Sequence, residues 1–431
     1  MSTPVFVEVT DTINATFITG FQRHTRELIR RLPCDAATGS FHVVPIVWCV
    51  GCNSFRHLDG HETELLDTPP PTSIPTRSRL SLLGDRLPGP LAAWAQRAVH
   101  FPAVRRRRDA LARRRGRATH PAEHAGLRID DWPAGSWFFD LEAVWHNSAT
   151  RDRLLPQLRS LGVTTSALIA DVMPEQFPEW FSQVTVDVFH RFITAHLESS
   201  DHFVCISEST RRDLIQLARR LGRTRPLDAV VIPLGADFAD SASADLPRAL
   251  VGRQFLLCVG TLEPRKNQKL AIDALERLDA HPELALVLVG RVGWKVEDLV
   301  ERIEHHPLLG TRLFWLESVD DALLQTLYRS AFLAITSSRY EGYGMPVIEA
   351  LAYGTPTISS TGGALPEAGG ELVEVIDPDD VEGLVDLVQR HLEDQEFHQR
   401  QRDALVGYRA PTWDDAAGAL DATLNAFIAA D

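Results

Sequence analysis

The sequence has few cysteines, no long apolar run and fewer basic than acidic residues, and each shortage excludes a class of protein. Five cysteines in 431 residues do not make a disulfide framework, so reduced thiols are expected. No stretch approaches the roughly 18 apolar residues of a membrane span. The N-terminus also lacks a basic region followed by an apolar run. We therefore expect a cytoplasmic protein.

The charge balance is acidic overall but uneven along the chain. A net charge of −14 argues against general nucleic-acid affinity. Residues 69–121, however, are rich in proline and arginine with almost no acidic residues, which indicates an insertion. Its arginine runs, 105–108 and 113–115, lie near Leu91 and Trp94 in the sequence. This composition suits contact with an anionic membrane surface, although a solvated charged helix explains it equally well.

Two short patterns have spacings that a metal site could use. Cys49 and Cys52 form a CxxC pair, but the other three cysteines are scattered and supply no second pair. Residues 377–380 (DPDD) lie where an expected strand turns into a helix, so we interpret them as capping residues. Neither pattern predicts a metal.

The chain is longer than one hydrophobic core usually requires, so two domains are expected. Apolar strand candidates alternate with helical periodicity in both halves, which predicts doubly wound parallel sheets. The strand candidates are residues 5–9, 41–48, 136–141, 164–170, 202–206 and 229–233, then 255–260, 284–290, 312–318, 332–338, 355–360 and 371–376. The small, polar segment 239–250 suits a linker. We therefore expect an N-terminal domain over 1–240 and a C-terminal domain over 251–410.

Residues 260–267 (GTLEPRKN) follow an expected parallel strand and precede an expected helix. Open α/β sheets bind ligands at this end of their strands. Arg265 and Lys266 together could neutralise a diphosphate. The alternative is a solvated pair of charges at a helix start, but cations are disfavoured there. A bound anion would explain the exception.

Residues 341–349 (EGYGMPVIE) form a second strand-to-helix pattern. Its two glycines permit close approach of a ligand, and a helix start attracts anions and sugar oxygens. Pro346 suits the first position of the new helix. Glu349 would then lie in the first turn, where a carboxylate is favourable without any ligand. Glu341 lies in the loop before the helix, so helix electrostatics do not explain it. The two segments together therefore indicate a ligand site more strongly than either segment alone.

Together these two segments resemble the donor-binding motifs of glycosyltransferase family 4, whose second motif is two glutamates separated by seven residues. The similarity continues through residues 361–367, 376–378, 19–28, 207–214 and 232–237. The resemblance implies a GT-B fold, in which two Rossmann-like domains face each other. The C-terminal domain would hold a nucleotide sugar and the N-terminal domain the acceptor. Residues 411–431 would be a helix that crosses back to the first domain.

The resemblance also implies roles for individual residues. Arg265 and Lys266 would bind the donor diphosphate, and Glu349 would bind the ribose. Glu341 would contact sugar hydroxyls, and the Gly20 amide would approach the phosphates from the other domain. The other donor-binding positions that match the second motif are Gly342, Gly344, Met345, Pro346 and Val347.

One position departs from the family pattern. Many members carry a His-Asp pair after the strand that here spans residues 164–170, whereas this chain has Ala170 and Asp171. Asp171 is therefore either a catalytic residue that assists acceptor deprotonation or a residue that orders the following loop. The second role is favoured because a carboxylate at a loop start commonly caps.

The family resemblance implies a hexosyltransferase that retains anomeric configuration and has no obligatory metal or cofactor. Fixed cations and a helix dipole can stabilise the leaving group instead. The overall resemblance favours GDP-mannose as donor and a glycan or lipid-linked glycan as acceptor, in surface polysaccharide synthesis at the inner face of the membrane. A sugar-nucleotide epimerase, a phosphorylase of the same architecture and a non-catalytic sugar-nucleotide-binding protein remain alternatives. Specificity would come from separate loops, such as residues 290–295.

Overall fold

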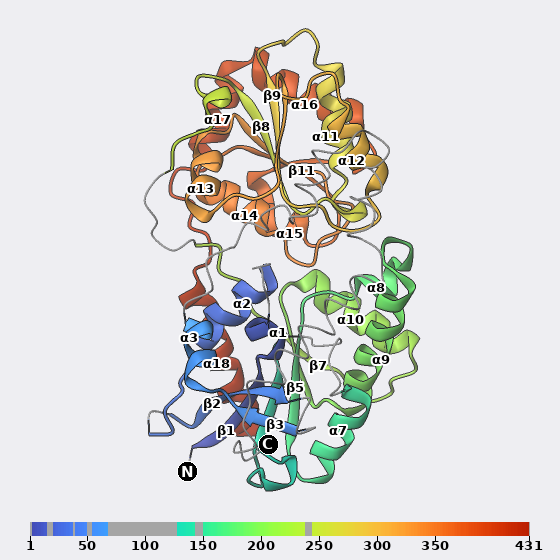
Figure 1. Cartoon of the computed structure of the whole chain (residues 1–431), viewed down its shortest axis with the longest axis vertical. Helices are drawn as coiled ribbons and strands as arrows, with labels where there is room; N and C mark the ends of the chain where they lie inside the picture. The colour runs from blue at the N-terminus through green and yellow to red at the C-terminus, as the bar shows by residue number, and fades with distance from the viewer. Residues whose placement is uncertain are drawn as a thin grey trace, which may run out of the picture.

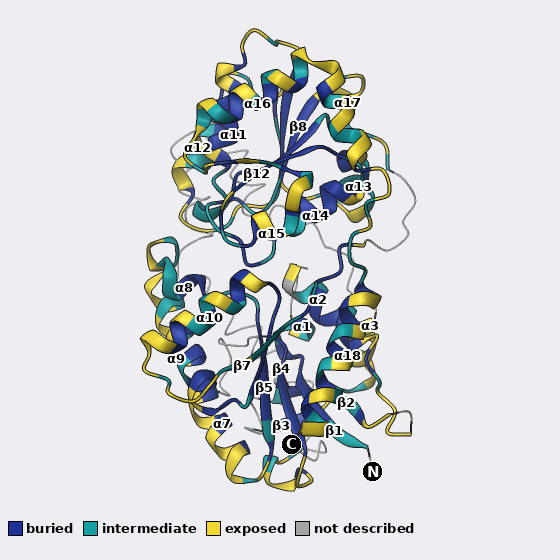
Figure 2. Ribbon diagram, turned by 180° about the vertical axis from the view of Figure 1, so that it is seen from behind, coloured by how far each residue is buried: buried dark blue, intermediate teal, exposed yellow. Residues whose placement is uncertain are grey.

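The alternating apolar segments fold into two α/β domains, each with helices on both faces of one sheet (Figure 1). The computed structural model describes residues 2–14, 20–37, 39–49, 54–67, 127–142, 150–237 and 244–430. Buried residues follow the two sheets and the helix sides that face them (Figure 2). The expected pair of doubly wound α/β domains is confirmed.

The first sheet has the strand order β3-β2-β1-β4-β5-β6-β7 and is parallel except at one edge. Its strands are β1 (Thr3–Glu8), β2 (Phe41–Cys49), β3 (Ser54–His57), β4 (Trp137–Asp140), β5 (Thr164–Ile169), β6 (His202–Cys205) and β7 (Asp228–Val231). The sequence did not predict β3, because this antiparallel edge strand is only four residues long and has no apolar run.

The second sheet is entirely parallel, with the order β10-β9-β8-β11-β12-β13. Its strands are β8 (Phe255–Val259), β9 (Ala285–Val289), β10 (Leu313–Leu316), β11 (Leu333–Thr336), β12 (Thr357–Ser360) and β13 (Glu374–Ile376). Central strands such as β9 are buried at every residue, because helices cover both faces of a parallel sheet.

The helices of the first domain are α1 (Thr10–Asn14), α2 (Gly20–Ile29), α3 (Gly60–Asp67), α7 (Arg151–Ser160), α8 (Met173–Gln176), α9 (Gln183–Ser199) and α10 (Glu208–Arg220). Those of the second are α11 (Gln268–Arg277), α12 (Glu297–Glu304), α13 (Asp321–Ser330), α14 (Met345–Ala352), α15 (Leu365–Gly369), α16 (Val381–Glu393) and α17 (Gln395–Ala404). Side chains of Ser207, Asp320 and Asp380 accept N–H groups in the first turns of α10, α13 and α16. The capping interpretation of Asp380 is thereby confirmed.

The last helix, α18 (Trp413–Ala430), packs on the first domain, beside α2 and α3 in Figure 1. Its buried residues recur at helical spacing and join the core of the first sheet. They are Trp413, Ala416, Ala417, Leu420, Leu424 and Phe427. A β-carbon on Gly235 would lie 2.4 Å from the Trp413 nitrogen, so the helix start lies directly against the first domain.

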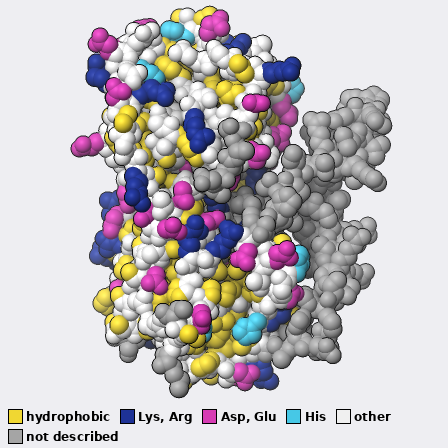
Figure 3. Space-filling model, turned by 90° about the vertical axis from the view of Figure 1, so that its left-hand side faces the viewer, with side chains coloured by type: hydrophobic (Ala, Val, Ile, Leu, Met, Phe, Trp, Pro, Cys, Tyr) yellow, Lys and Arg dark blue, Asp and Glu magenta, His cyan; other side chains and the backbone are white. Residues whose placement is uncertain are grey.

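The sequence predicted a linker over residues 239–250, and the described part, residues 244–250, contains a short 3-10 turn. Leu250 ends a 3-10 turn, is 1% exposed and packs with Phe255 in the core of the second domain. Among the described helices, none combines the length and the apolar character of a membrane span. On the face shown in Figure 3, basic and acidic side chains are interspersed over both domains.

Candidate functional site

The loop after β8 places two cations at the carboxyl end of the second sheet. Arg265 and Lys266 lie in a 3-10 turn, and Asn267 adopts the left-handed conformation with φ 52°. The Asn267 side-chain amide donates to the carbonyl of Pro378 (2.7 Å), which ties this turn to the segment that follows β13. Helix α11 begins only at Gln268, so the two cations precede the helix instead of occupying its first turn.

Both cations already have carboxylate partners. The Arg265 guanidinium donates to Glu341 (2.6 Å) and to Glu263 (3.0 Å), and the Lys266 ammonium pairs with the other oxygen of Glu341. The side chains of Arg265 and Lys266 are only 16% and 12% exposed. They are therefore not a solvated pair of charges, which excludes that alternative, while the expected contact with a diphosphate stays a prediction.

Glu341 is the centre of this ion cluster. Burial by itself would raise its pKa, but Arg265 and Lys266 lower the pKa to about 2. The Ser338 hydroxyl donates to Glu341 as well (2.6 Å). The carboxylate is thus held ionised at the loop between β11 and α14, close to the cations that the sequence assigned to a diphosphate.

Glu263 is a member of the cluster that the sequence did not single out. It is 4% exposed, and burial raises its pKa although Arg265 opposes this rise. Its Oε2 atom is buried without a hydrogen-bond partner among the described residues. The sequence signal was available, because Glu263 lies two residues before Arg265 in the same motif.

Helix α14 begins at Met345, one residue before the position expected from Pro346. Gly344, with φ 102°, precedes the first helical residue, and Pro346 is the second. Val347 is fully buried in an apolar cluster with Leu351, and its N–H donates to the Gly344 carbonyl (2.9 Å). The structure therefore places Val347 in the packing of the helix start.

Glu349 is the fifth residue of α14, beyond the first turn that the sequence predicted. It is 7% exposed, and its Oε2 accepts a hydrogen bond from the hydroxyl of Tyr328 (2.8 Å). Burial raises the pKa of Glu349 to about 7, against the opposing effects of Arg23 and Tyr328. The attraction of a helix start for a carboxylate therefore does not explain why Glu349 is buried with a raised pKa.

Gly342 packs against the first domain. Its carbonyl accepts hydrogen bonds from Ser207 (2.7 Å) and Thr210 (3.2 Å) at the start of α10. A β-carbon on Gly342 would lie 2.3 Å from the carbonyl oxygen of Ala170. The structure shows that this glycine permits domain contact, and the expected ligand approach stays a prediction.

Asp171 follows β5 and lies beside the same contact. Its Oδ1 accepts the backbone N–H of Met173 (3.0 Å), which is the loop-ordering bond that the sequence favoured. Burial raises the pKa of Asp171, and Arg265 lowers it while Glu341 raises it. The electrostatic coupling places Asp171 near the ion cluster, although the two belong to different domains.

Two further contacts join the domains around this point. The carboxylate of Glu367 accepts the backbone N–H groups of Glu208 (2.8 Å) and Ser209 (3.1 Å) at the start of α10. The Tyr343 hydroxyl accepts from the nitrogen of Leu234 (2.9 Å) and donates to its carbonyl (3.0 Å). The sequence did not predict these contacts of Glu367 and Tyr343, because the partners lie more than 100 positions away along the chain.

The 290–295 loop contacts the first domain, and its expected contribution to donor specificity stays a prediction. The Trp294 indole donates to the carbonyl of Trp180 (2.8 Å), and Lys295 donates to the carbonyl of Glu179 (2.6 Å). Lys295 adopts φ 55°, an uncommon conformation for a residue other than glycine. These side chains hold the loop that follows Asp171.

Several expected features lie at or beyond the limits of the described residues. Gly20 begins α2 and is exposed, and a β-carbon added to it would meet no described atom within 4 Å. Cys52 and the whole of residues 69–121, including the arginine runs, lie outside the described residues. The membrane hypothesis for these arginines therefore stays a prediction.

A buried ion network in the first domain was also missed. Arg151 pairs with Asp140 and with Glu8 (2.9 Å), and His196 lies 3.0 Å from Asp140. The side chains in these pairs are at most 1% exposed. Glu8 and Asp140 are the last residues of β1 and β4. An acidic residue at the end of each of these apolar strands could have predicted the buried ion network.

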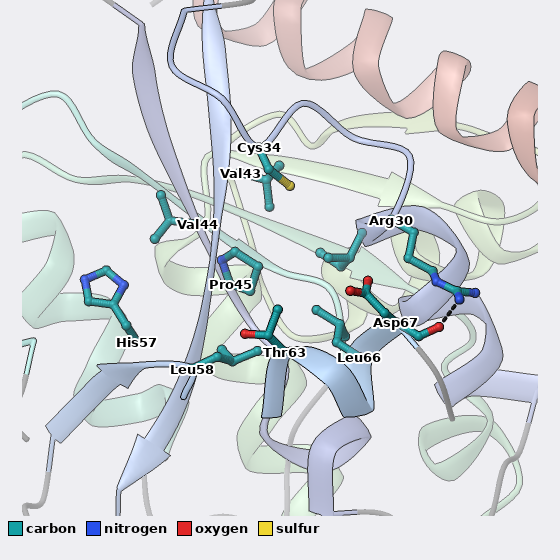
Figure 4. Close-up of a pocket in the computed structure, with 11 residues that line it drawn as sticks. Arg30, Cys34, Val43, Val44, Pro45, His57, Leu58, Thr63, Leu66 and Asp67 are labelled. Carbon is teal, nitrogen blue, oxygen red and sulfur yellow. Dashed lines mark hydrogen bonds between the residues drawn. The ribbon is translucent and has the colours of Figure 1, made fainter. Parts of the chain in front are cut away.

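An open pocket of about 500 Å³ lies elsewhere in the first domain, between α2, β2, β3 and α3 (Figure 4). Its lining includes Arg30, Cys34, Thr63 and Asp67 among apolar side chains. It shares no residue with the two sequence motifs, so it is separate from the candidate donor site.

Comparison with known proteins agrees with this geometry. Residues 247–405 match the family described as glycosyl transferases group 1. The serotype-specific mannosyltransferase WbdA of Escherichia coli is 32% identical over 218 residues, covering 47% of this chain and 27% of WbdA. The O-antigen chain mannosyltransferase B of Escherichia coli is 28% identical over 258 residues, covering 57% of this chain and 65% of that protein. The chain thus spans only about a quarter of the length of the first relative.

The whole chain also superposes on a solved structure. Sucrose-phosphate synthase from Thermosynechococcus elongatus matches with a TM-score of 0.59 and 18% identity, covering 100% of both chains. At this level of identity the match concerns the fold. Residues 247–405 are therefore similar to group 1 glycosyl transferases, and they lie within a two-domain GT-B fold.

Proposed function

We propose that this chain is a retaining hexosyltransferase of glycosyltransferase family 4. The observation that carries the proposal is the cluster of Arg265, Lys266 and Glu341 at the carboxyl end of the second sheet. Asp171 and Glu349 interact electrostatically with members of this cluster. Ligands bind at this edge of open α/β sheets. The match to group 1 glycosyl transferases covers the cluster and Glu349, whereas Asp171 lies outside it.

The chemistry of the cluster fits transfer from a nucleotide sugar. When the bond between the anomeric carbon and the diphosphate breaks, negative charge develops on the leaving diphosphate. Arg265 and Lys266 would stabilise that charge, and Glu349 would hold the ribose. Glu341 would bind sugar hydroxyls and orient both cations. No metal or other cofactor is required by this scheme.

The acceptor hydroxyl must lose its proton as the new glycosidic bond forms. Asp171 is the candidate for this step in the first domain, because burial raises its pKa and a more basic carboxylate is a better proton acceptor. In the same position it also orders the loop through Met173. The two roles are compatible.

The names of the bacterial relatives favour mannose as the transferred sugar, with GDP-mannose as the donor. A glycan or lipid-linked glycan in surface polysaccharide synthesis is the proposed acceptor. The arginine-rich segment would then bring a cytoplasmic enzyme to the anionic inner face of the membrane. Co-sedimentation with anionic vesicles that is unchanged after Arg105–Arg108 are replaced by serine would contradict the membrane contact.

Lys266→Ala tests the catalytic proposal. It should lower kcat by about a hundredfold or more, since it removes a cation that stabilises the leaving group. Transfer is measured by mass spectrometry of products from GDP-mannose and from other sugar nucleotides with a glycan acceptor.

Lys269→Ala is the matched control, because Lys269 lies on the exposed side of α11 and pairs only with Asp273 among the described residues. Normal turnover by Lys266→Ala would refute the assignment. Donor binding by the wild-type chain without any transfer would favour a sugar-nucleotide-binding protein, and an altered sugar nucleotide formed without acceptor would favour an epimerase.

A further inference from the structure

The carboxyl group of Glu349 is held from behind by a buried tyrosine. The Tyr328 hydroxyl, on α13, donates to Glu349 Oε2 on α14 at 2.8 Å. Tyr328 is 1% exposed and Glu349 is 7% exposed, so this bond forms where water has little access. A hydrogen bond to a charged group is worth most in such surroundings.

Tyr328 is itself fixed by its surroundings. The Thr355 hydroxyl donates to the Tyr328 carbonyl (2.6 Å). The Tyr328 ring stacks on that of Tyr353, with centroids 5.9 Å apart and an interplanar angle of 13°. The Arg329 guanidinium lies 4.7 Å from the centroid of the Tyr353 ring. The position of the Tyr328 hydroxyl is thus determined before any ligand arrives.

The other oxygen of Glu349 is differently placed. Among the described residues Oε1 has no hydrogen-bond partner, and it is not one of the enclosed polar atoms. The charged groups that act on this carboxyl group are Arg23 of α2, Asp321 of α13 and Lys266 of the ion cluster. One oxygen is thus occupied by the protein, and the other is left available to accept a hydrogen bond.

We propose that Tyr328 is a positioning residue for donor binding: its hydroxyl fixes Glu349 so that a single carboxylate oxygen is presented to the ribose hydroxyls of a nucleoside diphosphate. This inference rests on the proposed function, since it assumes that Glu349 binds ribose. Tyr328 does not touch the donor itself. Its contribution is to remove the rotational freedom of the carboxylate before binding.

The same bond affects the pH at which binding occurs. The carboxylate form of Glu349 accepts ribose hydroxyls, and burial raises its pKa to about 7. The Tyr328 hydrogen bond lowers this pKa, as do Arg23 and Lys266, while Asp321 raises it. Removing the Tyr328 hydroxyl should therefore move the pH midpoint of nucleotide binding upward.

The test compares a ribonucleoside diphosphate with its 2′,3′-dideoxy analogue by isothermal titration calorimetry at several pH values. The probe is whichever of ADP, CDP, GDP and UDP raises the melting temperature of the wild-type protein most. Tyr328→Phe should weaken binding of the ribonucleotide about tenfold. Binding of the dideoxy analogue should not change. A merely structural defect would instead weaken binding of both nucleotides.

Tyr408→Phe is the matched control, because Tyr408 is a partly buried tyrosine of the same domain, packed against the Val347 cluster. It should bind both nucleotides as the wild-type protein does. If Tyr328→Phe does not fold, Thr355→Val removes the hydroxyl that holds the Tyr328 carbonyl and should give the same selective loss, to a smaller extent.

The outcomes separate this inference from the function on which it rests. A wild-type protein that binds no nucleoside diphosphate, or that binds both forms equally, contradicts the donor-site proposal and the inference with it. A wild-type protein that prefers the ribonucleotide, together with a Tyr328→Phe variant that keeps the full preference and the same pH midpoint, overturns the inference alone.

Discussion

Glu341 holds both cations of the donor motif with a single carboxylate. The sequence indicated a contact with sugar hydroxyls, whereas the structure pairs this side chain with Arg265 and Lys266. A diphosphate must bind the same cations in the presence of this negative charge. Glu341 thus orders Arg265 and Lys266 and also opposes the anion that they would bind.

Glu341→Gln should therefore act in opposite directions on binding and turnover. Removing the charge should tighten nucleoside diphosphate binding about three- to tenfold, as measured by calorimetry. Transfer should fall at least tenfold, because the cations and the sugar are no longer held by the carboxylate. Glu371→Gln, at an exposed position, is the control. Weaker nucleotide binding by Glu341→Gln would show that orientation of the cations outweighs repulsion.

The protonation state of Glu349 should make the stability of the free protein depend on pH. Its pKa is raised from 4.5 to about 7 in the folded state, so the folded protein holds this proton more tightly than the unfolded chain. Stability conferred by the protonated form is complete below pH 4.5 and is lost as the pH rises through about 7.

Glu349→Gln should consequently be more stable than the wild-type protein at high pH. The gain should grow between pH 5 and pH 8 and reach about 1 to 3 kcal/mol, as measured by urea unfolding at each pH. Donor binding should weaken in the same variant. A stability difference that does not vary with pH would contradict the raised pKa of Glu349.

At the scale of elements, the loop before α14 serves the contact between the domains as well as the donor site. Gly342 lies against the end of β5 and the start of α10, and the neighbouring Tyr343 bonds to Leu234. Glu367, at the start of α15, bonds to the first turn of α10. The 341–349 segment is therefore connected by hydrogen bonds and packing to the first domain.

Gly342→Ala should separate these two roles. The added methyl group would lie 2.3 Å from the Ala170 carbonyl, so the two domains must move apart. Transfer should fall at least tenfold, while nucleoside diphosphate affinity changes less than twofold because the cation cluster lies within one domain. Gly418→Ala, which meets nothing within 4 Å on α18, is the control. Full transfer activity in Gly342→Ala would show that the domain contact is dispensable.

At the scale of the whole molecule, the C-terminal helix belongs to the first domain although it follows the second in sequence. Trp413 is 2% exposed, its backbone N–H donates to Asp237 (2.7 Å), and its ring lies against Gly235. The chain thus crosses between the domains twice, and the second crossing closes the core of the first sheet.

Trp413→Ala should destabilise the first domain selectively. Loss of a fully buried tryptophan typically costs about 3 to 5 kcal/mol. Hydrogen exchange measured at increasing urea concentration should show reduced protection in the peptides of β1, α2 and α18. The peptides of β8 and β9 should stay as protected as in the wild-type protein. Uniform loss of protection in both domains would mean that the two cores unfold as one.

The fold and the donor motifs were largely predictable from the sequence, because their causes are local. Apolar strands alternating with amphipathic helices leave only doubly wound sheets, and both motifs follow strands directly. The edge strand β3 was missed because four residues without an apolar run carry no periodic signal. The start of α14 was misplaced by one residue because Gly344, and not Pro346, ends the preceding loop.

The sequence by itself determined the two-domain α/β architecture and pointed to the residues that we propose for donor binding. Only the tertiary structure decided what those residues contact. The pairing of Arg265 and Lys266 with Glu341, and the hold of Tyr328 on Glu349, join separate elements of the second domain. Such contacts depend on how helices and loops pack over the sheets, and side-chain packing between distant segments leaves no periodic trace in a single sequence.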